Sequence, residues 1–339
     1  MTQNLISYSI LIIIYFLFKI LFKNMRSKFY EKHQRLTGKE FVPLLGGVIM
    51  FSYYSYSISI NDLNLFIFSF LILLLGIFSD NNLLQSPKLR LILQSVILFL
   101  FLLFSDLQIN DLRNNFLNEI LSNYYMGLIF STFCLLVLIN GSNFIDGLDG
   151  LNLGYFFLII VIILFLSYEL EIEVDNNNIK EIFHIISFLL ILNLMNYLYL
   201  GDSGSYLVGF IFGVFLIELN NYNYFISPYF IALLLWYPAF ENLFSIIRKK
   251  LSKKDPLKPD NLHFHQLLFN FLKQNKNKVL KKYCNSASSF LIILYNSIIF
   301  AISVGFLNHT KVLLIVLLFN VINYLLFYYL LKKKLYHIK

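Results

Sequence analysis

Eleven long apolar runs divide the sequence, and they restrict how the chain can fold more than any other feature. A helix that crosses a membrane needs about 20 consecutive residues that are mostly apolar. The runs cover residues 4–22, 44–60, 63–79, 89–105, 123–139, 151–168, 182–200, 205–219, 225–244, 289–307 and 312–331. The sequence therefore predicts an all-α integral membrane protein with about eleven transmembrane helices, in which residues 1–339 form a single polytopic membrane domain.

The composition argues against a soluble domain. Of the 339 residues, 58% are hydrophobic and 14% are charged, and the chain contains 37 Phe and 23 Tyr. A soluble domain of this length has no core large enough to bury so many large apolar side chains. The first run has no basic residue before it and no small-residue cleavage site after it, so we expect a retained helix and not a cleaved signal peptide.

The basic residues predict how the chain is oriented in the membrane. Cytoplasmic loops of membrane proteins are enriched in Lys and Arg. With eleven spans and an outside N-terminus, all of the 27 Lys and Arg residues except Arg113, Lys180 and Lys311 lie on the cytoplasmic side. We therefore expect the N-terminus outside and the C-terminus in the cytoplasm. The net charge of +8 then reflects topology and attraction to anionic lipid, and no nucleic-acid partner is expected.

Four polar clusters fall between the apolar runs, and the same orientation places all four on the cytoplasmic side. Their sequences are GIFSDNNLLQSPKLR (76–90), NGSNFIDGLDGL (140–151), LGDSGSYLVG (200–209) and KPDNLHFHQLL (258–268). At this face of a membrane a lipid head group can meet a soluble molecule of the cytosol. The predicted cytoplasmic active-site loops are residues 76–90, 140–151, 200–205 and 245–288.

An amide and two carboxylates recur at a spacing of three residues in the second cluster: Asn143, Asp146 and Asp149. Gly and Asn between two helices are ordinary turn residues, and Asp is an ordinary helix N-cap. A turn does not require two carboxylates at the end of an apolar helix, however, where unpaired charge is unfavourable. If the segment is helical, the spacing places the three side chains near one face, and convergent acceptors of this kind suit Mg²⁺.

Asp202 and the two histidines of the fourth cluster each allow two interpretations. Asp202, in GDSGS, either caps the helix that follows or holds a metal ion or phosphate at the helix start. His263 and His265 either lie in a polar loop without a role or act on a phosphate, since a zinc site there lacks enough nearby ligands. Residues 266–273 are predicted to form a short amphipathic helix that lies on the membrane surface.

Six segments lie in order between about residue 40 and residue 270. They are LLGGV, SDNNLLQSPKLRLILQ, NGSNFIDGLDGLNLG, LGDSGSYLVG, WYPAFENLFSIIRK and DNLHFHQLL. Together they resemble the signature segments of the polyprenyl-phosphate N-acetylhexosamine-1-phosphate transferases of glycosyltransferase family 4. The resemblance implies a many-helix enzyme with a cytoplasmic active site. Such an enzyme transfers a sugar 1-phosphate from a UDP-sugar to a polyprenyl phosphate, releases UMP and requires Mg²⁺, for which Mn²⁺ is an alternative.

The resemblance also implies roles for individual residues. Asp80 matches a base or a carboxylate that orients the lipid phosphate, and Asn81 stands where the family has a second Asp. The remaining matches are Asn143 and Asp146 at the catalytic centre, Gly147, Leu148 and Asp149 in the uridine pocket, Asp202 on the metal, Arg90 near the phosphates, and His263 and His265 at the diphosphate. Glu241 falls where the family often carries an acid.

The histidine segment separates two branches of the family that the chain resembles. The branch acting on UDP-muramoyl-pentapeptide shows a run of consecutive histidines, which DNLHFHQLL lacks. The expected donor is therefore UDP-GlcNAc or a related UDP-N-acetyl sugar, and the expected acceptor is undecaprenyl phosphate. The alternatives are a phospho-N-acetylmuramoyl-pentapeptide transferase, an inactive homologue that has lost the second Asp, and a transporter or channel with acidic residues along an ion path.

The expected location is the inner (cytoplasmic) membrane of a bacterium. The high content of Asn, Ile, Lys and Phe is typical of an AT-rich genome. The expected products start O-antigen, lipopolysaccharide, cell-wall or other surface glycans. Besides the two substrates, the lipid bilayer is the expected partner, and a homodimer is compatible with this interpretation.

Overall fold

The computed structural model describes residues 2–21, 42–170, 172, 176–256, 258, 260–274 and 281–336. Its helices are α1 (Thr2–Leu21), α2 (Gly46–Asn61), α3 (Leu63–Asp80), α4 (Pro87–Ser105), α5 (Asn115–Leu121), α6 (Tyr124–Ile145), α7 (Leu151–Glu169), α8 (Asn176–Leu194), α9 (Gly201–Tyr222), α10 (Pro228–Leu234), α11 (Trp236–Leu251), α12 (Phe264–Lys273), α14 (Cys284–Val304) and α15 (Thr310–Tyr336). The basic segment 23–39 and residues 257, 259 and 275–280 of the predicted loop 245–288 lie outside the described residues.

Each of the eleven apolar runs overlaps a helix or, for residues 225–244, the pair α10 and α11, and run 182–200 extends six residues beyond the end of α8. Among the described helices, α3, α4, α6, α7, α9, α14 and α15 are each long and apolar enough to cross a membrane, and α10 with α11 is an eighth candidate if the pair is one span. The prediction of an all-α membrane protein is thus confirmed. The apolar part of α1 (Ile6–Leu21) is shorter and α2 has 16 residues, so the number of eleven spans and the orientation stay predictions.

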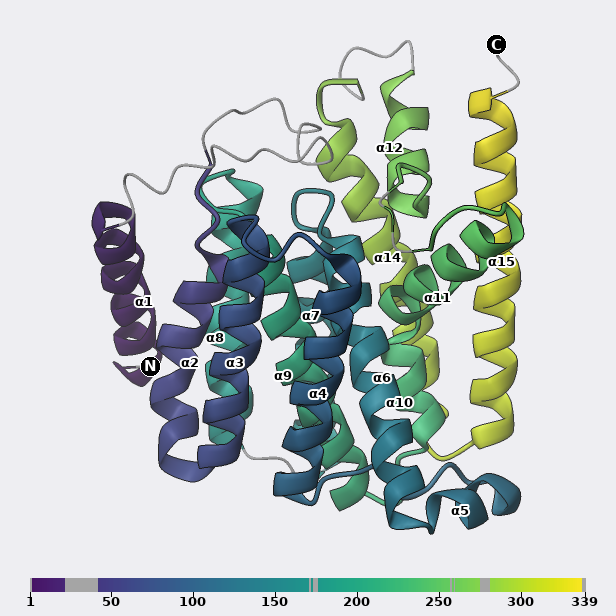
Figure 1. Ribbon diagram of the computed structural model, residues 1–339, viewed down its shortest axis with the longest axis horizontal. Coiled ribbons are helices and arrows are strands. Elements are labelled where there is room, and N and C mark those ends of the chain that lie inside the picture. Colours follow the sequence, from purple (N-terminus) through teal and green to yellow (C-terminus); the bar gives the residue numbers. More distant parts are fainter. Residues whose placement is uncertain are drawn as a thin grey trace.

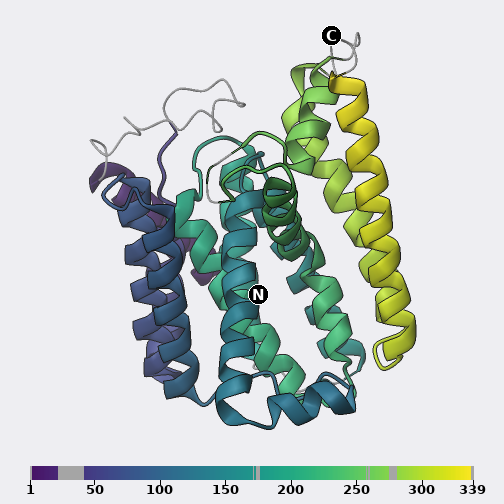
Figure 2. The ribbon, with the colours of Figure 1, turned by 45° about the vertical axis from the view of Figure 1, so that its right-hand side comes forward.

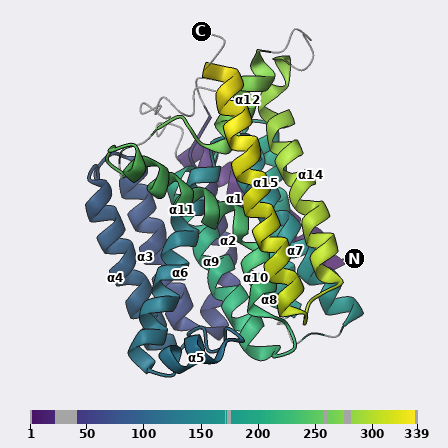
Figure 3. The same cartoon turned by 90° about the vertical axis from the view of Figure 1, so that its right-hand side faces the viewer.

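Most of the helices run in the same general direction and surround α9 (Figure 1). α9 contacts α2, α3, α6 and α7, and it lies in the middle of the bundle in both Figure 1 and Figure 3. α14 and α15 stand side by side at one edge, which Figure 2 shows from another direction. α5 lies across one end of the bundle, and α12 lies at the opposite end.

Glycines bring three helices into close contact at the start of α9. A Cβ on Gly76 of α3 would lie 2.3 Å from Ser203 Cα, and a Cβ on Gly47 of α2 would lie 2.6 Å from Gly204 N. Small residues allow the backbones of membrane helices to approach one another closely. The last turn of α3 therefore lies directly beside the first turn of α9.

The ninth apolar run is not one straight helix, because α10 and α11 are bent by 74° around Leu235. A break leaves backbone groups without helical partners, which is unfavourable inside a membrane. Tyr155 of α7 supplies such partners: its hydroxyl donates to Leu234 O (2.9 Å) and accepts from Tyr237 N (3.4 Å). The bend directs α11 across the bundle, whereas its neighbours run along it (Figure 1).

The predicted amphipathic segment 266–273 is part of α12. Its apolar side chains Leu267, Phe269 and Leu272 are buried, and α12 packs against α14 and α15. Figure 1 shows α12 beside the ends of these two helices. The predicted helix is confirmed. Protein side chains, and not lipid, cover these three apolar side chains, while the expected contact of the helix with the membrane surface stays a prediction.

Candidate active site

A pocket of about 430 Å³ lies at the end of the bundle where α4, α6, α9 and α11 meet the segment before α12. Six of the ten predicted site residues line it: Arg90, Asn143, Asp146, Gly147, Asp202 and His263. The predicted residues that do not line it are Asp80, Leu148, Asp149 and His265. All four polar clusters thus contribute predicted residues to the pocket. Three of them do so on or next to α4, α6 and α9, and the fourth does so through His263.

Asp80, the last residue of α3, caps α9 from the neighbouring helix. Its Oδ1 accepts a hydrogen bond from Asp202 N (2.8 Å), and its Oδ2 accepts one from Ser203 N (3.1 Å). A helix start has free N–H groups and a partial positive charge, so a carboxylate is favourable there. Gly201 permits the approach, because its φ is +69° and a Cβ would lie 2.8 Å from Asp80 Oδ2. Asp80 therefore holds Asp202 in place from behind the pocket wall.

The Asp202 side chain is directed toward α3 and α4. Ser79 Oγ donates a hydrogen bond to Asp202 Oδ2, and Arg90 Nη1 donates to the same oxygen at 3.0 Å. Arg90 Nη1 also donates to Ser79 Oγ (2.5 Å), while Tyr206 OH lies 3.5 Å from Asp202 Oδ2. The Arg90 and Asp202 side chains both remain 26% exposed. Since Asp80 makes the cap, the interpretation of Asp202 as a helix cap is wrong, and its carboxylate faces the pocket.

α6 continues to Ile145, so part of the predicted loop 140–151 is helical, and Asp146 begins the turn that follows. Burial raises the pKa of Asp146 well above its usual value. A hydrogen bond with Ser205 opposes this shift, and the nearby carboxylates of Asp202 and Asp80 add to it. Several carboxylates that repel one another in a partly enclosed site favour a cation between them.

Asp149 is carried away from the pocket by the same turn. Its backbone N–H donates to Asn285 Oδ1 of α14 (2.8 Å), and Gly150 N donates to Asn193 Oδ1 of α8 (2.6 Å). These two bonds hold the turn against helices that are remote in sequence. The expectation that Asp149 shares a helical face with Asn143 is therefore wrong, because the helix ends before Asp149 is reached.

The two predicted histidines occupy different environments at the start of α12. His263 lines the pocket, whereas His265 is completely buried. Their rings are stacked with centroids 5.7 Å apart, and a Cβ on Gly147 would lie 2.8 Å from His265 Nε2. Burial lowers the pKa of His265 to about 3, so its ring is neutral at physiological pH. His263 is thus accessible from the pocket, and His265 packs beneath Gly147.

The part of the chain that forms α3 to α9 matches a known protein family. Residues 63–220 match the family described as glycosyl transferase family 4. The matched segment has 158 of the 339 residues, which is just under half of the chain. This match bears out the resemblance of the signature segments. The matched part of the chain contains Asp80, Arg90, Asn143, Asp146 and Asp202.

One relative of the chain is named for the transfer of a phosphorylated sugar. The decaprenyl-phosphate N-acetylglucosaminephosphotransferase of Mycolicibacterium smegmatis (strain ATCC 700084 / mc(2)155) is 28% identical to the chain over 170 residues. The match covers 43% of this chain and 41% of the relative. It therefore spans about two fifths of the relative's own length.

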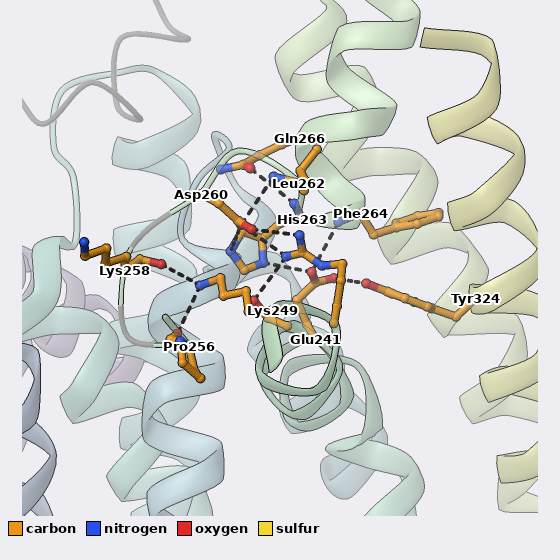
Figure 4. A network of polar contacts seen from close by, with 12 residues as sticks. Glu241, Lys249, Pro256, Lys258, Asp260, Leu262, His263, Phe264, Gln266 and Tyr324 are labelled. Atoms are coloured by element: carbon orange, nitrogen blue, oxygen red, sulfur yellow. Dashed lines mark hydrogen bonds and ion pairs between the residues drawn. The ribbon is translucent and has the colours of Figure 1, made fainter. Parts of the chain in front are cut away.

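The pocket wall opposite the glycosyl transferase family 4 segment comes from α11 and the residues before α12 (Figure 4). Arg248 donates to both carboxylate oxygens of Asp260, at 2.7 and 3.1 Å. Burial by itself raises the pKa of Asp260, but the Arg248 guanidinium holds it below the usual value. Lys249 Nζ donates to Pro256 O (3.2 Å) and Lys258 O (2.7 Å), so the ammonium is fixed in the pocket wall.

Arg248 and Lys249 were not predicted as site residues. They belong to a cluster of basic residues, and the enrichment of Lys and Arg in cytoplasmic loops was sufficient to account for that cluster. The signal that distinguishes them is their place near the end of a helix that is apolar on one face only, with Glu241, Asn242 and Ser245 on the other. Such a polar face inside an apolar run indicates burial against other polar groups.

The carboxylates of this pocket can be tested against the metal that the resemblance implies. Within the described residues, no three His, Cys, Asp or Glu side chains are grouped closely enough to hold a metal ion by themselves. Mg²⁺ commonly uses one or two carboxylates and completes its shell with phosphate oxygens and water. Asp146 and Asp202 both line the pocket, and the carboxylates around Asp146 favour a cation there. The donor set therefore fits Mg²⁺ bound together with a phosphate-bearing substrate.

Proposed function

We propose that this protein transfers an N-acetylhexosamine 1-phosphate from a UDP-sugar to undecaprenyl phosphate and releases UMP. The donor is UDP-GlcNAc or a related UDP-N-acetyl sugar. The observation that carries the proposal is one pocket in which Asp146 and Asp202 lie with the cationic side chains Arg90 and Lys249. The name of the mycobacterial relative, which specifies a polyprenyl phosphate and N-acetylglucosamine, supports the same reaction.

The pocket has a polar part and an apolar part, as a lipid phosphate requires. The apolar lining residues include Leu91, Phe133, Leu136, Val137, Leu243 and Ile246. Phe133 is 51% exposed on the outside of the bundle, on a helix that is a candidate membrane span. A prenyl chain can therefore remain in lipid while its phosphate lies among the polar side chains.

The reaction joins two anions, so its main requirement is charge neutralisation and positioning. An oxygen of undecaprenyl phosphate attacks the β-phosphorus of the UDP-sugar. The new P–O bond forms while the bond from the β-phosphorus to the bridging oxygen breaks, and UMP leaves with that oxygen. A phosphate monoester is already a competent nucleophile, so we favour direct attack without a covalent intermediate on an Asp.

Several side chains take defined parts in this reaction. Arg90 and Lys249 offset the negative charge of the substrate phosphates. Two N–H groups of the Lys249 ammonium are bound to backbone carbonyls, and its third N–H can donate to a phosphate. His263 contacts the diphosphate, and Asp80 orients Asp202 through the start of α9. Asp202 and Asp146 would hold Mg²⁺, which supplies further positive charge to the phosphates when bound.

We further propose that the pocket faces the cytoplasm of a bacterium and that its product starts a surface glycan such as O-antigen. UDP-sugars are soluble, and the positively charged segments predicted on this side agree with that orientation.

The proposed function is tested by measuring UMP release from purified protein in detergent. The assay contains UDP-GlcNAc, undecaprenyl phosphate and Mg²⁺, and each is omitted in turn. We expect UMP only when all three are present. Release from UDP-GalNAc or UDP-muramoyl-pentapeptide, but not from UDP-GlcNAc, would change the donor and keep the reaction. No release with any of the three donors, in the presence of decaprenyl phosphate as well, would contradict the proposal.

Replacing Asn81 with Asp tests whether the chain is an inactive homologue. Asn81 is exposed, caps the end of α3, and donates from Nδ2 to Ile77 O (2.9 Å). Asp cannot donate this bond, and its charge meets the negative end of the helix, which costs about 0.3–1 kcal/mol. We therefore expect a slightly lower unfolding temperature and UMP release that stays within about threefold of the wild type. If the wild type released no UMP and the Asn81→Asp variant did, the chain would be an inactive homologue that has lost the second Asp.

A further inference from the structure

Glu241 is a buried carboxylate to which the reaction described above assigns no part. It lies on α11, next to the bend, and is 1% exposed. A buried carboxylate is strongly unfavourable unless several donors satisfy it. Glu241 therefore either stabilises this part of the fold alone or serves the groups that it binds.

Three donors from two other helices converge on Glu241 (Figure 4). Oε1 lies 2.9 Å from His263 Nδ1 and accepts from Phe264 N at 3.2 Å, and Oε2 accepts from Tyr324 OH at 2.8 Å. The first two donors belong to the start of α12, and Tyr324 belongs to α15. Of the three, His263 is the residue that lines the pocket.

The hydrogen bond to Glu241 determines where His263 carries its proton. An ionised carboxylate can only accept, so this contact favours a proton on Nδ1. The other ring nitrogen, Nε2, lies on the side of Asp260, whose Oδ1 is 3.6 Å away. Asp260 is itself bound through both oxygens by Arg248, so it competes weakly for this nitrogen.

We propose that Glu241 is a positioning residue for the sugar-phosphate transfer, which acts through His263. Its carboxylate accepts from Nδ1–H and orients the ring so that Nε2, when it also carries a proton, donates to an oxygen of the UDP-sugar diphosphate. The inference rests on the proposed function for the identity of the substrate, but the bond between Glu241 and His263 does not. Tyr324 holds the second carboxylate oxygen and so keeps the carboxylate from turning away.

Two substitutions separate this role from simple packing. Glu241→Gln retains an oxygen that can accept from His263 Nδ1 and Phe264 N, while its amide group can donate to the Tyr324 oxygen. Glu241→Leu keeps most of the volume and removes every acceptor. Without Glu241, Asp260 Oδ1 still lies 3.6 Å from Nε2, so the proton is expected to move to that nitrogen.

The first experiment measures the tautomer of His263 by ¹⁵N NMR of histidine-labelled protein at pH 9, with His263→Ala used to assign the signal. We expect the Nδ1–H form in the wild type and in Glu241→Gln, and the Nε2–H form in Glu241→Leu. Tyr324→Phe is the matched control, because it removes a donor to the same carboxylate and leaves His263 bound. The same His263 signal in the wild type and Glu241→Leu would overturn the proposal.

The second experiment is a double-mutant cycle on kcat for UMP release. Loss of the group that orients a functional histidine lowers performance by about 10–100-fold at metal sites. We expect Glu241→Leu to lower kcat by at least about tenfold in the wild type and by less than about twofold when His263 is already Ala. Equal losses in both backgrounds would show that Glu241 acts through something other than His263.

The two experiments also distinguish this inference from the proposed function. If the wild type releases no UMP from any donor, the proposed function fails, while the tautomer measurement still decides whether Glu241 fixes His263. If UMP is released and Glu241→Leu keeps the wild-type kcat, the proposed function stands and the positioning role is refuted.

Discussion

Replacing Asp202 with Asn is expected to lower kcat for UMP release by at least about 100-fold, as removal of a key electrostatic group in an active site commonly does. Asn has nearly the same shape, so the fold is retained, but the variant loses the charge that pairs with Arg90 and that we propose for Mg²⁺ binding. Raising Mg²⁺ should recover part of the activity, because the variant weakens metal binding. The measurement is the initial rate of UMP release as a function of Mg²⁺ concentration.

Asp106→Asn is the matched control for Asp202→Asn. Asp106 is exposed at the far end of α4 and has a φ of +51°, a conformation that Asn accepts readily. We expect its rate to stay within about twofold of the wild type. Wild-type kcat in Asp202→Asn at every Mg²⁺ concentration would contradict the role of Asp202 as a metal ligand.

Replacing Gly76 with Ala is expected to lower both stability and activity. The new Cβ would lie 2.3 Å from Ser203 Cα, and backbone cannot turn aside as a side chain can. Overpacking of this kind costs about 1–3 kcal/mol. Because the start of α9 must move, Asp202 is displaced relative to Arg90, and a misplacement of this size lowers kcat by about tenfold or more. The measurements are the thermal unfolding midpoint in detergent and the rate of UMP release.

Gly305→Ala is the control for the substitution at Gly76. Gly305 ends α14 with a helical φ of −66°, and a Cβ there would meet one atom, at 3.5 Å. Its unfolding midpoint should equal or exceed that of the wild type, since Ala restricts the unfolded chain more than Gly does. Equal midpoints and rates for Gly76→Ala and the wild type would show that the contact between α3 and α9 is looser than described.

Much of the fold could be predicted from the sequence because a long apolar run in a membrane forms a helix, which satisfies its own backbone hydrogen bonds. The bend around Leu235 was missed, although Pro238 carried a signal: Pro is tolerated in the first turn of a helix but breaks a helix interior, so it favours a helix that begins just before it. The burial of α12 was missed because an amphipathic helix has the same pattern whether lipid or protein covers its apolar face.

The candidate site was predictable where a residue acts close to its own helix end, as Asp146 and Asp202 do. It was not predictable where a remote contact decides the outcome. Asp149 is turned away by Asn285, which is 136 residues later in the chain. Similarly, Asp80 and Asp202 look alike in sequence, and only the packing of α3 on α9 makes one a cap and the other a pocket residue.

The central position of α9 has a consequence for how the protein is made. In its most apolar 18-residue stretch, 89% of residues are buried, compared with 22% in α4 and α15, and α9 has the lowest mean hydropathy of the seven candidate spans. Its main neighbours α2, α3 and α6 all precede it in the chain. During synthesis, the helices that enclose α9 are thus already in the membrane when α9 leaves the ribosome. A helix poorly suited to lipid can then pass directly to protein neighbours, so the order of the helices favours insertion of the polar GDSGS turn.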